Sequence, residues 1–272
     1  MTNLNKEEIR ESIRTRYGQI AEEYPVKELS DCGCGGADPT TSSCCSDAGS
    51  FQNYSKILGY SEAELKNIPE GANMGLGCGN PQAIASIQPG ETVLDLGAGG
   101  GFDCFIAAKS VGKTGKVIGV DMTPSMVSKA RTNIKKVNAE NVEFRLGEIE
   151  HLPVEDNSVD VIISNCVVNL SPDKQQVFKD AARVLKKGGR MAIKDIIATK
   201  ELPENLRSDL DQISACIGGA EQITLTEKML KSAGFSEVRV EPDEESRKLI
   251  NQWSQGRNLG EYIVSASITA IK

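Results

Sequence analysis

The sequence predicts an α/β protein built on a doubly wound sheet that is mostly parallel and has an antiparallel edge. From residue 91 to residue 198, short apolar runs alternate with helical patterns. Alternation of this kind is typical of parallel strands joined by helical crossovers, with helices on both faces of the sheet. A strongly alternating run closes the chain at residues 261–272 and is expected to form an edge strand. A chain of 272 residues can bury one large core, so we expect one α/β unit with smaller extensions.

Each core element has its own pattern. Strands are expected at residues 91–97, 116–121, 141–147, 158–165 and 190–196, and helices at residues 102–111, 124–137 and 172–187. Thr123 and Pro124 are suited to start the second helix. Ser171 is expected to cap the third helix, and Gly188 with Gly189 to end it.

Three regions follow from these patterns. Residues 1–70 are expected to hold an amphipathic helix over residues 6–24 and a mobile cysteine-rich loop over residues 30–50. Residues 71–200 form the sheet core. Residues 201–272 are expected to form a helix at 201–220 that ends at Gly218 and Gly219, a helix at 226–233, and strands at 237–241 and 261–272.

Composition excludes several kinds of partner. The net charge of -7 and the pI near 5.1 oppose binding to nucleic acid, because proteins that bind it usually present a basic face. No stretch approaches the roughly 20 apolar residues that span a bilayer, and the first residues are polar. We therefore expect a cytoplasmic protein without a membrane or nucleic-acid partner. Eight cysteines in such a compartment favour metal, metalloid or redox chemistry over permanent disulfides.

A glycine loop after the first strand indicates a nucleotide site. Residues 95–101 read Asp-Leu-Gly-Ala-Gly-Gly-Gly, and Phe102 stands where a dinucleotide fingerprint would have its third glycine. The G-x-G-x-G form favours S-adenosylmethionine over a dinucleotide or flavin, which remain the alternatives. Further positions lie at the carboxyl ends of the predicted strands, where ligands of open α/β sheets bind. The expected cofactor contacts are Asp95 for the amino group, Gly97, Ala98 and Gly99 in the loop, Asp121 for the ribose, Met122, Glu148 and Ile149 near adenine, and Asn165.

Three cysteines stand at places that can converge beside this cofactor. Cys166 follows the fourth strand, Cys216 ends the predicted helix over the site, and Cys78 lies in a turn between glycines. Their wide spacing differs from the local C-x-x-C pairs of zinc fingers. The alternative is that each is a small buried hydrophobe, and we assign Cys104 to that role.

Several segments together resemble the arsenite methyltransferase family. The match lies between residues 71 and 233 and includes GLGCGNP, VLDLGAGGGFDC, VIGVDMT, SNCVVNLSPDKQQV, VLKKGGR and ACIGGA. The resemblance implies a Rossmann-like class I methyltransferase fold and a role in arsenic detoxification. It further implies that Cys166 and Cys216 bind As(III), that Cys78 is needed for the first methylation, and that an N-terminal cysteine exchanges disulfides with Cys78. Cys32, Cys34, Cys44 and Cys45 are the candidates for that cysteine, and we favour Cys32.

The chemistry expected from this resemblance needs little acid–base catalysis. As(III) is soft and suits thiolate ligands. Three thiolates leave its lone pair free to attack the methyl group when the reacting atoms are held about 3 to 3.5 Å apart. The expected substrates are arsenite or its glutathione and other thiol conjugates, with thioredoxin or glutathione as external reductant. Two other functions remain open, a methyltransferase for a small quinone-like acceptor and a metalloid-binding protein without catalysis.

Overall fold

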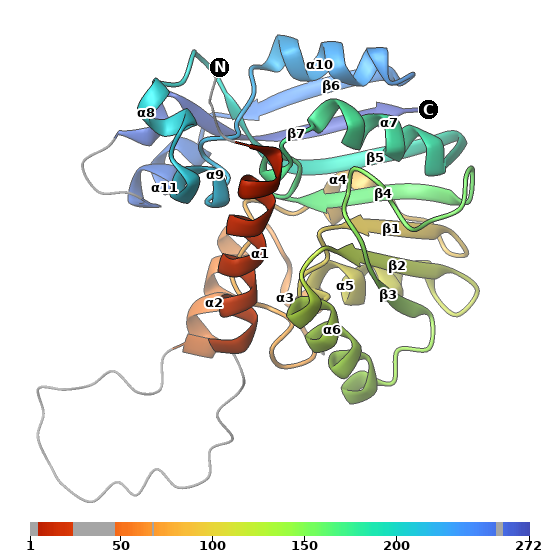
Figure 1. Ribbon diagram of the computed structural model, residues 1–272. Helices are drawn as coiled ribbons and strands as arrows, with labels where there is room; N and C mark the ends of the chain where they lie inside the picture. The colour runs from red at the N-terminus through yellow and green to blue at the C-terminus, as the bar shows by residue number, and fades with distance from the viewer. Residues whose placement is uncertain (1–4, 24–46, 67, 254–257) are drawn as a thin grey trace, which may run out of the picture.

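The computed structural model describes residues 5–23, 47–66, 68–253 and 258–272. Within these ranges the chain forms one seven-stranded sheet with helices on both faces (Figure 1). The strands are β1 (Thr92–Leu96), β2 (Lys116–Asp121), β3 (Val142–Leu146), β4 (Val159–Asn165), β5 (Leu185–Ala198), β6 (Ser236–Asp243) and β7 (Ile263–Ile271). The longer helices are α1 (Lys6–Glu23), α2 (Asp47–Ile57), α5 (Phe102–Val111), α6 (Pro124–Val137), α7 (Lys174–Val184), α10 (Ile223–Ser232) and α11 (Ser246–Trp253). Shorter helices are α3 (Glu62–Leu65), α4 (Gln82–Ala85), α8 (Glu204–Arg207) and α9 (Leu210–Ser214).

The order of strands confirms the predicted sheet. It runs β3-β2-β1-β4-β5-β7-β6, with β1 to β5 parallel and β7 antiparallel to both β5 and β6. After β1 the chain forms β2 and β3 on one side of β1, and it then crosses to form β4 on the other side of β1. This reversal beside β1 is the switch point at which doubly wound sheets bind ligands.

The two faces of β1 belong to different parts of the core, because successive side chains of a strand point to opposite sides. Leu94 and Leu96 are buried with Phe178 of α7 and Leu230 of α10. Val93 is buried on the other face with residues of α4, α5 and α6. Helix α1 lies beside the carboxyl ends of the parallel strands (Figure 1).

The helix expected at residues 172–187 is shorter than predicted. Asp173 caps α7, because its side chain accepts a hydrogen bond from the Gln176 N–H. The helix ends at Val184, and Leu185 already pairs with Val159 of β4. The predicted Ser171 cap and Gly188 stop were therefore wrong, since pairing with the neighbouring strand outweighs the helical preference of residues 185–187.

The region after β5 also differs from the prediction. Instead of one helix over residues 201–220 the chain forms α8 and α9, and Asp209 starts α9 by accepting from the Asp211 N–H. Gly218 packs so closely on α8 that an added Cβ would lie 2.5 Å from the Leu206 carbonyl oxygen. This close contact requires the chain to fold back, so Cys216 lies in a turn rather than in a helix. Helix α11 was not predicted, and α2 begins within the loop expected at residues 30–50.

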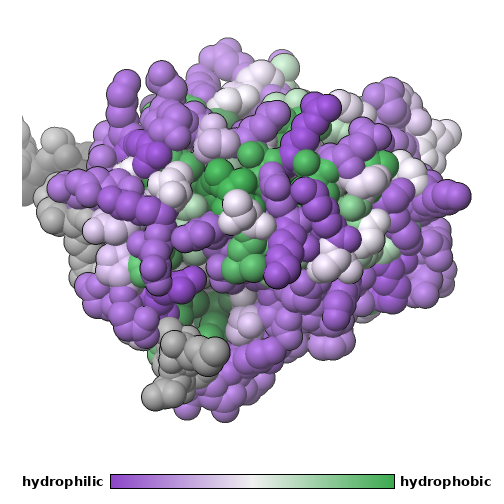
Figure 2. Space-filling model, turned by 90° about the horizontal axis from the view of Figure 1, so that it is seen from above, coloured by the Kyte–Doolittle hydropathy of each residue, from purple (hydrophilic) through white to green (hydrophobic). Residues whose placement is uncertain are grey.

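The described surface is mainly polar. Figure 2 shows one face on which hydrophilic residues predominate, with hydrophobic residues in smaller groups between them. Among the described helices, none combines the length and the apolar content needed to cross a membrane.

Candidate active site

A hollow that is open to solvent lies at the carboxyl ends of β1, β2 and β4. Its walls come from these strand ends, from α1 and α2, and from the chain between α3 and α4. The lining includes Tyr17, Tyr54, Tyr60, Met74, Asp95, Gly97, Ala98, Gly99, Asp103, Asp121, Met122, Ile149, Glu150, Asn165, Cys166 and Val167. Most of the residues that the sequence marked as cofactor contacts are thus brought to one cavity.

The glycine loop forms the floor of the hollow. Gly97 has φ +71°, and a Cβ there would lie 2.4 Å from the Val167 side chain. Only glycine fits both this backbone conformation and this contact. The Gly99 N–H donates to Asp121 Oδ2 over 2.9 Å, which joins the loop to the end of β2.

Asp121 is held in one orientation by two backbone donors. Its Oδ1 accepts from the Thr123 N–H over 2.8 Å, and its Oδ2 accepts from Gly99. Burial raises the pKa of this carboxyl, although the two backbone hydrogen bonds oppose the shift. Asp121 also lines the hollow, so its carboxylate is suited to accept hydrogen bonds from ligand hydroxyls.

A pair of buried carboxyls lies at the other side of the loop. Asp95 and Asp103 are 3% and 7% exposed, and both line the hollow. Burial raises the pKa of both, and the Asp103 charge raises that of Asp95 further. Tyr60 donates to Asp103 over 2.8 Å, and the Cys104 thiol donates to Asp95 over 3.2 Å. Two neighbouring buried carboxyls without a cation favour a positively charged ligand group.

Asp103 was missed in the sequence because an acidic residue in the first turn of a helix is common. Cys104 is fully buried on α5, as its assignment to the core required. Its thiol nevertheless contacts Asp95, which the sequence did not indicate.

Glu148 does not line the hollow, contrary to the sequence prediction. Its carboxylate pairs with Arg14 of α1 over 2.8 Å and with Arg10 over 3.5 Å. Glu150 is found in the lining instead, and it accepts a hydrogen bond from the Ser171 hydroxyl over 2.7 Å. The basic residues of α1, which the sequence did not connect with this site, hold the Glu148 carboxylate at the edge of the hollow, since Arg10 belongs to its lining.

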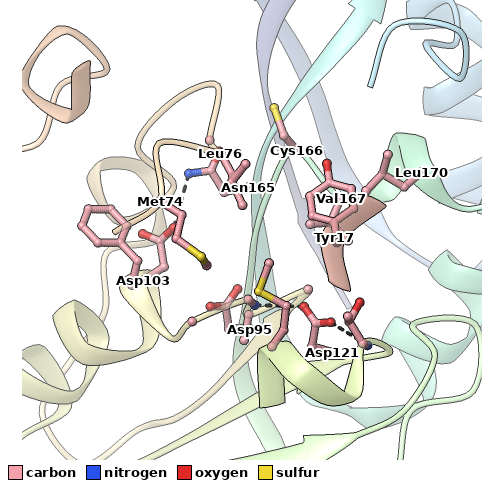
Figure 3. A pocket seen from close by; sticks show the side chains of 18 of the residues that line it. Tyr17, Met74, Leu76, Asp95, Asp103, Asp121, Asn165, Cys166, Val167 and Leu170 are labelled. Carbon is pink, nitrogen blue, oxygen red and sulfur yellow. Dashed lines mark hydrogen bonds between the residues drawn. The ribbon is translucent and has the colours of Figure 1, made fainter. Parts of the chain in front are cut away.

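Asn165 lies between the acidic end of the hollow and the cysteines (Figure 3). Its carboxamide contacts Asp103 and Tyr60 on one side, and the chain around Cys78 on the other. It therefore joins the two halves of the site.

The three core cysteines come together in one buried cluster. Cys78 and Cys166 form a disulfide, with their Cα atoms 5.9 Å apart. The Cys216 thiol donates to the Cys166 carbonyl oxygen over 2.8 Å. Cys166 and Cys216 have φ +58° and +63°, a conformation that is uncommon outside glycine and is often found at functional sites. The structure thus joins Cys78 and Cys166 through their sulfurs and places the Cys216 thiol against the Cys166 backbone.

Charged groups surround the sulfur atoms. An Asp195 carboxylate oxygen and the sulfurs of Cys78 and Cys166 all lie within 4.8 Å of one another. Burial raises the pKa of Asp195 to about 6, and that of the Cys216 thiol well above its ordinary value. Lys174, whose pKa is lowered by burial, is close enough to Asp195 and Cys216 for their charges to act on it. A carboxylate within the apolar strand β5 was a signal in the sequence that could have identified Asp195.

The N-terminal candidates cannot be compared with this cluster. Cys32, Cys34, Cys44 and Cys45 lie outside the described residues.

Several known proteins similar to this chain are arsenic methyltransferases by name. A methyltransferase domain family matches residues 87–234. The arsenite methyltransferase of Halobacterium salinarum is 52% identical over 273 residues, which covers 100% of this chain and 68% of that protein. The human arsenite methyltransferase is 35% identical over 230 residues, covering 81% of this chain and 56% of that protein. The crystal structure of an As(III) S-adenosylmethionine methyltransferase from Chlamydomonas reinhardtii superposes with a TM-score of 0.62 at 33% identity, covering 80% of this chain and 73% of that one.

Proposed function

Because this chain belongs to the arsenite methyltransferase family, we propose that it transfers a methyl group from S-adenosylmethionine to trivalent arsenic bound by its own cysteines. The observation that carries the proposal is the meeting of Cys78, Cys166 and Cys216 beside the hollow. A general methyltransferase needs the hollow but has no need of three sulfur side chains from separate elements.

The shape and charge of the hollow fit S-adenosylmethionine. Asp95 and Asp103 are suited to its ammonium group, because both are buried beside each other without a cation. Asp121 is oriented for the ribose hydroxyls, with Met122 and Ile149 as apolar neighbours for adenine. When bound, this cofactor supplies an electrophilic methyl group attached to a sulfonium.

Arsenic would bind to the sulfurs of Cys78 and Cys166 once these are reduced, with Cys216, whose thiol contacts the Cys166 carbonyl oxygen, as the third ligand. Three thiolates around As(III) leave one lone pair, which would form the As–C bond while the sulfonium S–C bond breaks and S-adenosylhomocysteine leaves. The arsenic is then formally As(V), and it would return to As(III) when two of its thiolates leave as a disulfide. The acceptor is then delivered by Cys166, which lines the hollow and belongs to the cysteine cluster. The protein's contribution is to hold the two reacting atoms in one geometry, which requires no general base at the arsenic.

The disulfide gives the proposal a redox requirement. Cys78 and Cys166 cannot bind arsenic while they are joined, so two electrons must first reduce them to thiols. Two external thiols supply these electrons and leave as a disulfide, and glutathione or thioredoxin is the proposed source. Cys32 is retained in the proposal as the cysteine that exchanges with Cys78. A cytoplasmic location is also part of it, because such reductants are maintained there.

The direct test is incubation of the full chain with arsenite, a dithiol and S-adenosylmethionine labelled on its methyl group. Labelled methylarsenic is the expected product. Cys166→Ser and Cys216→Ser are expected to abolish its formation while binding S-adenosylhomocysteine as the wild type does, because neither thiol holds the cofactor. Labelled methylarsenic from both variants at the wild-type rate would show that these cysteines do not hold the arsenic. Label on a different small molecule only would show that arsenic is not the acceptor.

A further inference from the structure

The carboxamide of Asn165 is occupied by the chain around Cys78. Its Oδ1 accepts from the Cys78 N–H over 2.9 Å, and its Nδ2 donates to the Gly79 carbonyl over 2.8 Å. The same Nδ2 lies 3.1 Å from the Tyr60 hydroxyl and 3.3 Å from Asp103 Oδ2. The orientation of the amide is determined by this network, because a flipped amide would point its NH₂ at the Cys78 N–H.

The loop is shaped to receive this carboxamide. A Cβ at Gly77 would lie 2.6 Å from Asn165 Nδ2 and 2.9 Å from its Oδ1. Gly79 likewise leaves no room for a Cβ, which would lie 2.8 Å from the Lys194 side chain. The glycines on either side of Cys78 therefore allow the loop backbone to lie directly on side chains of β4 and β5.

Cys78 is also fixed through its carbonyl. The Ser265 hydroxyl of β7 donates to the Cys78 oxygen over 3.0 Å. Cys78 belongs to no helix or strand, so these side chains, rather than a backbone ladder, determine where its sulfur lies. Asn165 directly precedes Cys166, so the same short segment carries one sulfur and holds the loop that carries the other.

We propose that Asn165 is a positioning residue that holds the Cys78 thiol opposite Cys166. This role deepens the proposed function, on which its importance for arsenic binding rests. This role differs from the cofactor contact that the sequence suggested for Asn165. The amide oxygen accepts from the Cys78 N–H, and the amide nitrogen makes its shortest hydrogen bond to the Gly79 carbonyl, so both atoms bind the protein itself. Without the amide, the Cys78 thiol is expected to spend less time close to the Cys166 thiol, which lowers the effective concentration of one thiol relative to the other.

The test measures how readily Cys78 and Cys166 pair in the full chain. Wild type and variants are equilibrated in glutathione redox buffers, quenched by alkylation, and the peptide pair containing Cys78 and Cys166 is quantified by mass spectrometry. Asn165→Ala is expected to lower the equilibrium constant for this disulfide about tenfold, which corresponds to about 30 mV for a two-electron couple. Binding of S-adenosylhomocysteine is the second readout and is expected to fall by a smaller factor than the disulfide equilibrium, since Asp95 and Asp121 are unchanged and Asp103 loses one hydrogen bond.

Two further variants complete the test. Gly77→Ala displaces the carboxamide from the loop side and is expected to shift the equilibrium in the same direction, which covers the case that Asn165→Ala does not fold. Asn141→Ala is the matched control, because its carboxamide likewise makes two hydrogen bonds to the backbone, both donated, to the carbonyls of Ala108 and Gly112, away from the hollow. It should leave the disulfide equilibrium unchanged.

The proposal is overturned if the equilibrium in both Asn165→Ala and Gly77→Ala stays within about twofold of wild type. It is equally overturned if Asn141→Ala shifts the equilibrium as much, because the effect would then reflect general loosening. A more than tenfold loss of S-adenosylhomocysteine binding with an unchanged equilibrium assigns Asn165 to the cofactor instead. None of these readouts requires methyl transfer, so failure of the proposed function would be seen separately.

Discussion

Replacing Asp121 by Asn tests the cofactor half of the site with the smallest chemical change. Both carboxylate oxygens face backbone donors, Gly99 at 2.9 Å and Thr123 at 2.8 Å. An amide has one oxygen, so one of these buried N–H groups would face an NH₂ and lose its acceptor. Leaving a buried donor unpaired costs about 1 to 3 kcal/mol, and a hydrogen bond to a neutral acceptor is weaker than one to a carboxylate.

The unpaired donor is present with and without ligand, so it is expected to lower the unfolding free energy by about 1 to 3 kcal/mol. The weaker hydrogen bonds from the ribose hydroxyls to a neutral acceptor are expected to weaken S-adenosylhomocysteine binding by about 1.4 kcal/mol, or roughly tenfold. Titration calorimetry at pH 7.5 measures the affinity, and urea unfolding checks that the variant is folded. Asp160→Asn is the matched control, because Asp160 accepts the Thr92 N–H over 2.9 Å at the amino end of β1, far along the strand from the hollow. It should bind the ligand as wild type does.

Wild-type affinity in a folded Asp121→Asn variant would refute this reasoning. It would mean that the ribose is held elsewhere, or that the hollow is not the cofactor site. An equal loss in Asp160→Asn would also refute it, since the loss would then report damage to the sheet.

Three further substitutions test other parts of the site. Gly97→Ala should reduce S-adenosylhomocysteine binding at least about tenfold by calorimetry, because φ +71° costs alanine about 1 kcal/mol or more and its Cβ would meet Val167. Tyr17→Phe removes the hydrogen bond to the Ser214 carbonyl at 3.3 Å, so urea unfolding should show a loss of about 1 kcal/mol; unchanged stability would contradict this contact. Asp195 has a folded pKa of about 6 against 3.8, so the native state binds more protons than the unfolded state between these values and loses stability as pH rises. Relative to wild type, Asp195→Asn should therefore gain about 2 kcal/mol in unfolding free energy between pH 4.5 and 7, and a constant difference would be inconsistent with this pKa.

The sheet was predictable because its signals are local. The bounds of α5, α6 and β2 agree with the sequence pattern, since each element has an apolar period and clear ends. The errors lie where a distant partner determines the local structure. Residues 185–187 read as the end of a helix and form a strand because β4 lies beside them. The turn at Cys216 likewise follows from the packing of Gly218 on α8.

In the candidate site, too, residues with a local signal could be predicted and residues that depend on distant partners could not. Asp95, Asp121 and Cys166 could be placed at the hollow from the sequence because the first two lie at the ends of strands, the third directly follows one, and the fold brings strand ends together. Asp103, Tyr60 and the basic face of α1 could not be inferred in this way, because their roles depend on side-chain pairing across the cavity. Glu148 is the instructive error, since its position in the chain was suitable but Arg14 determines where its carboxylate lies.

Both the carboxyls of the hollow and the cysteine cluster hold buried ionisable groups whose charged forms are disfavoured until a ligand binds. Burial raises the pKa of Asp95 and Asp103, which disfavours their charged forms, and a cation between them would remove this penalty. Burial also raises the pKa of the Cys216 thiol, so a bare thiolate is disfavoured there. A bound As(III) ion replaces the thiol protons and carries the compensating charge itself. The carboxyls are therefore suited to an organic cation and the thiols to a soft ion, and the carboxamide of Asn165 connects the Asp103 carboxyl with the backbone of Cys78.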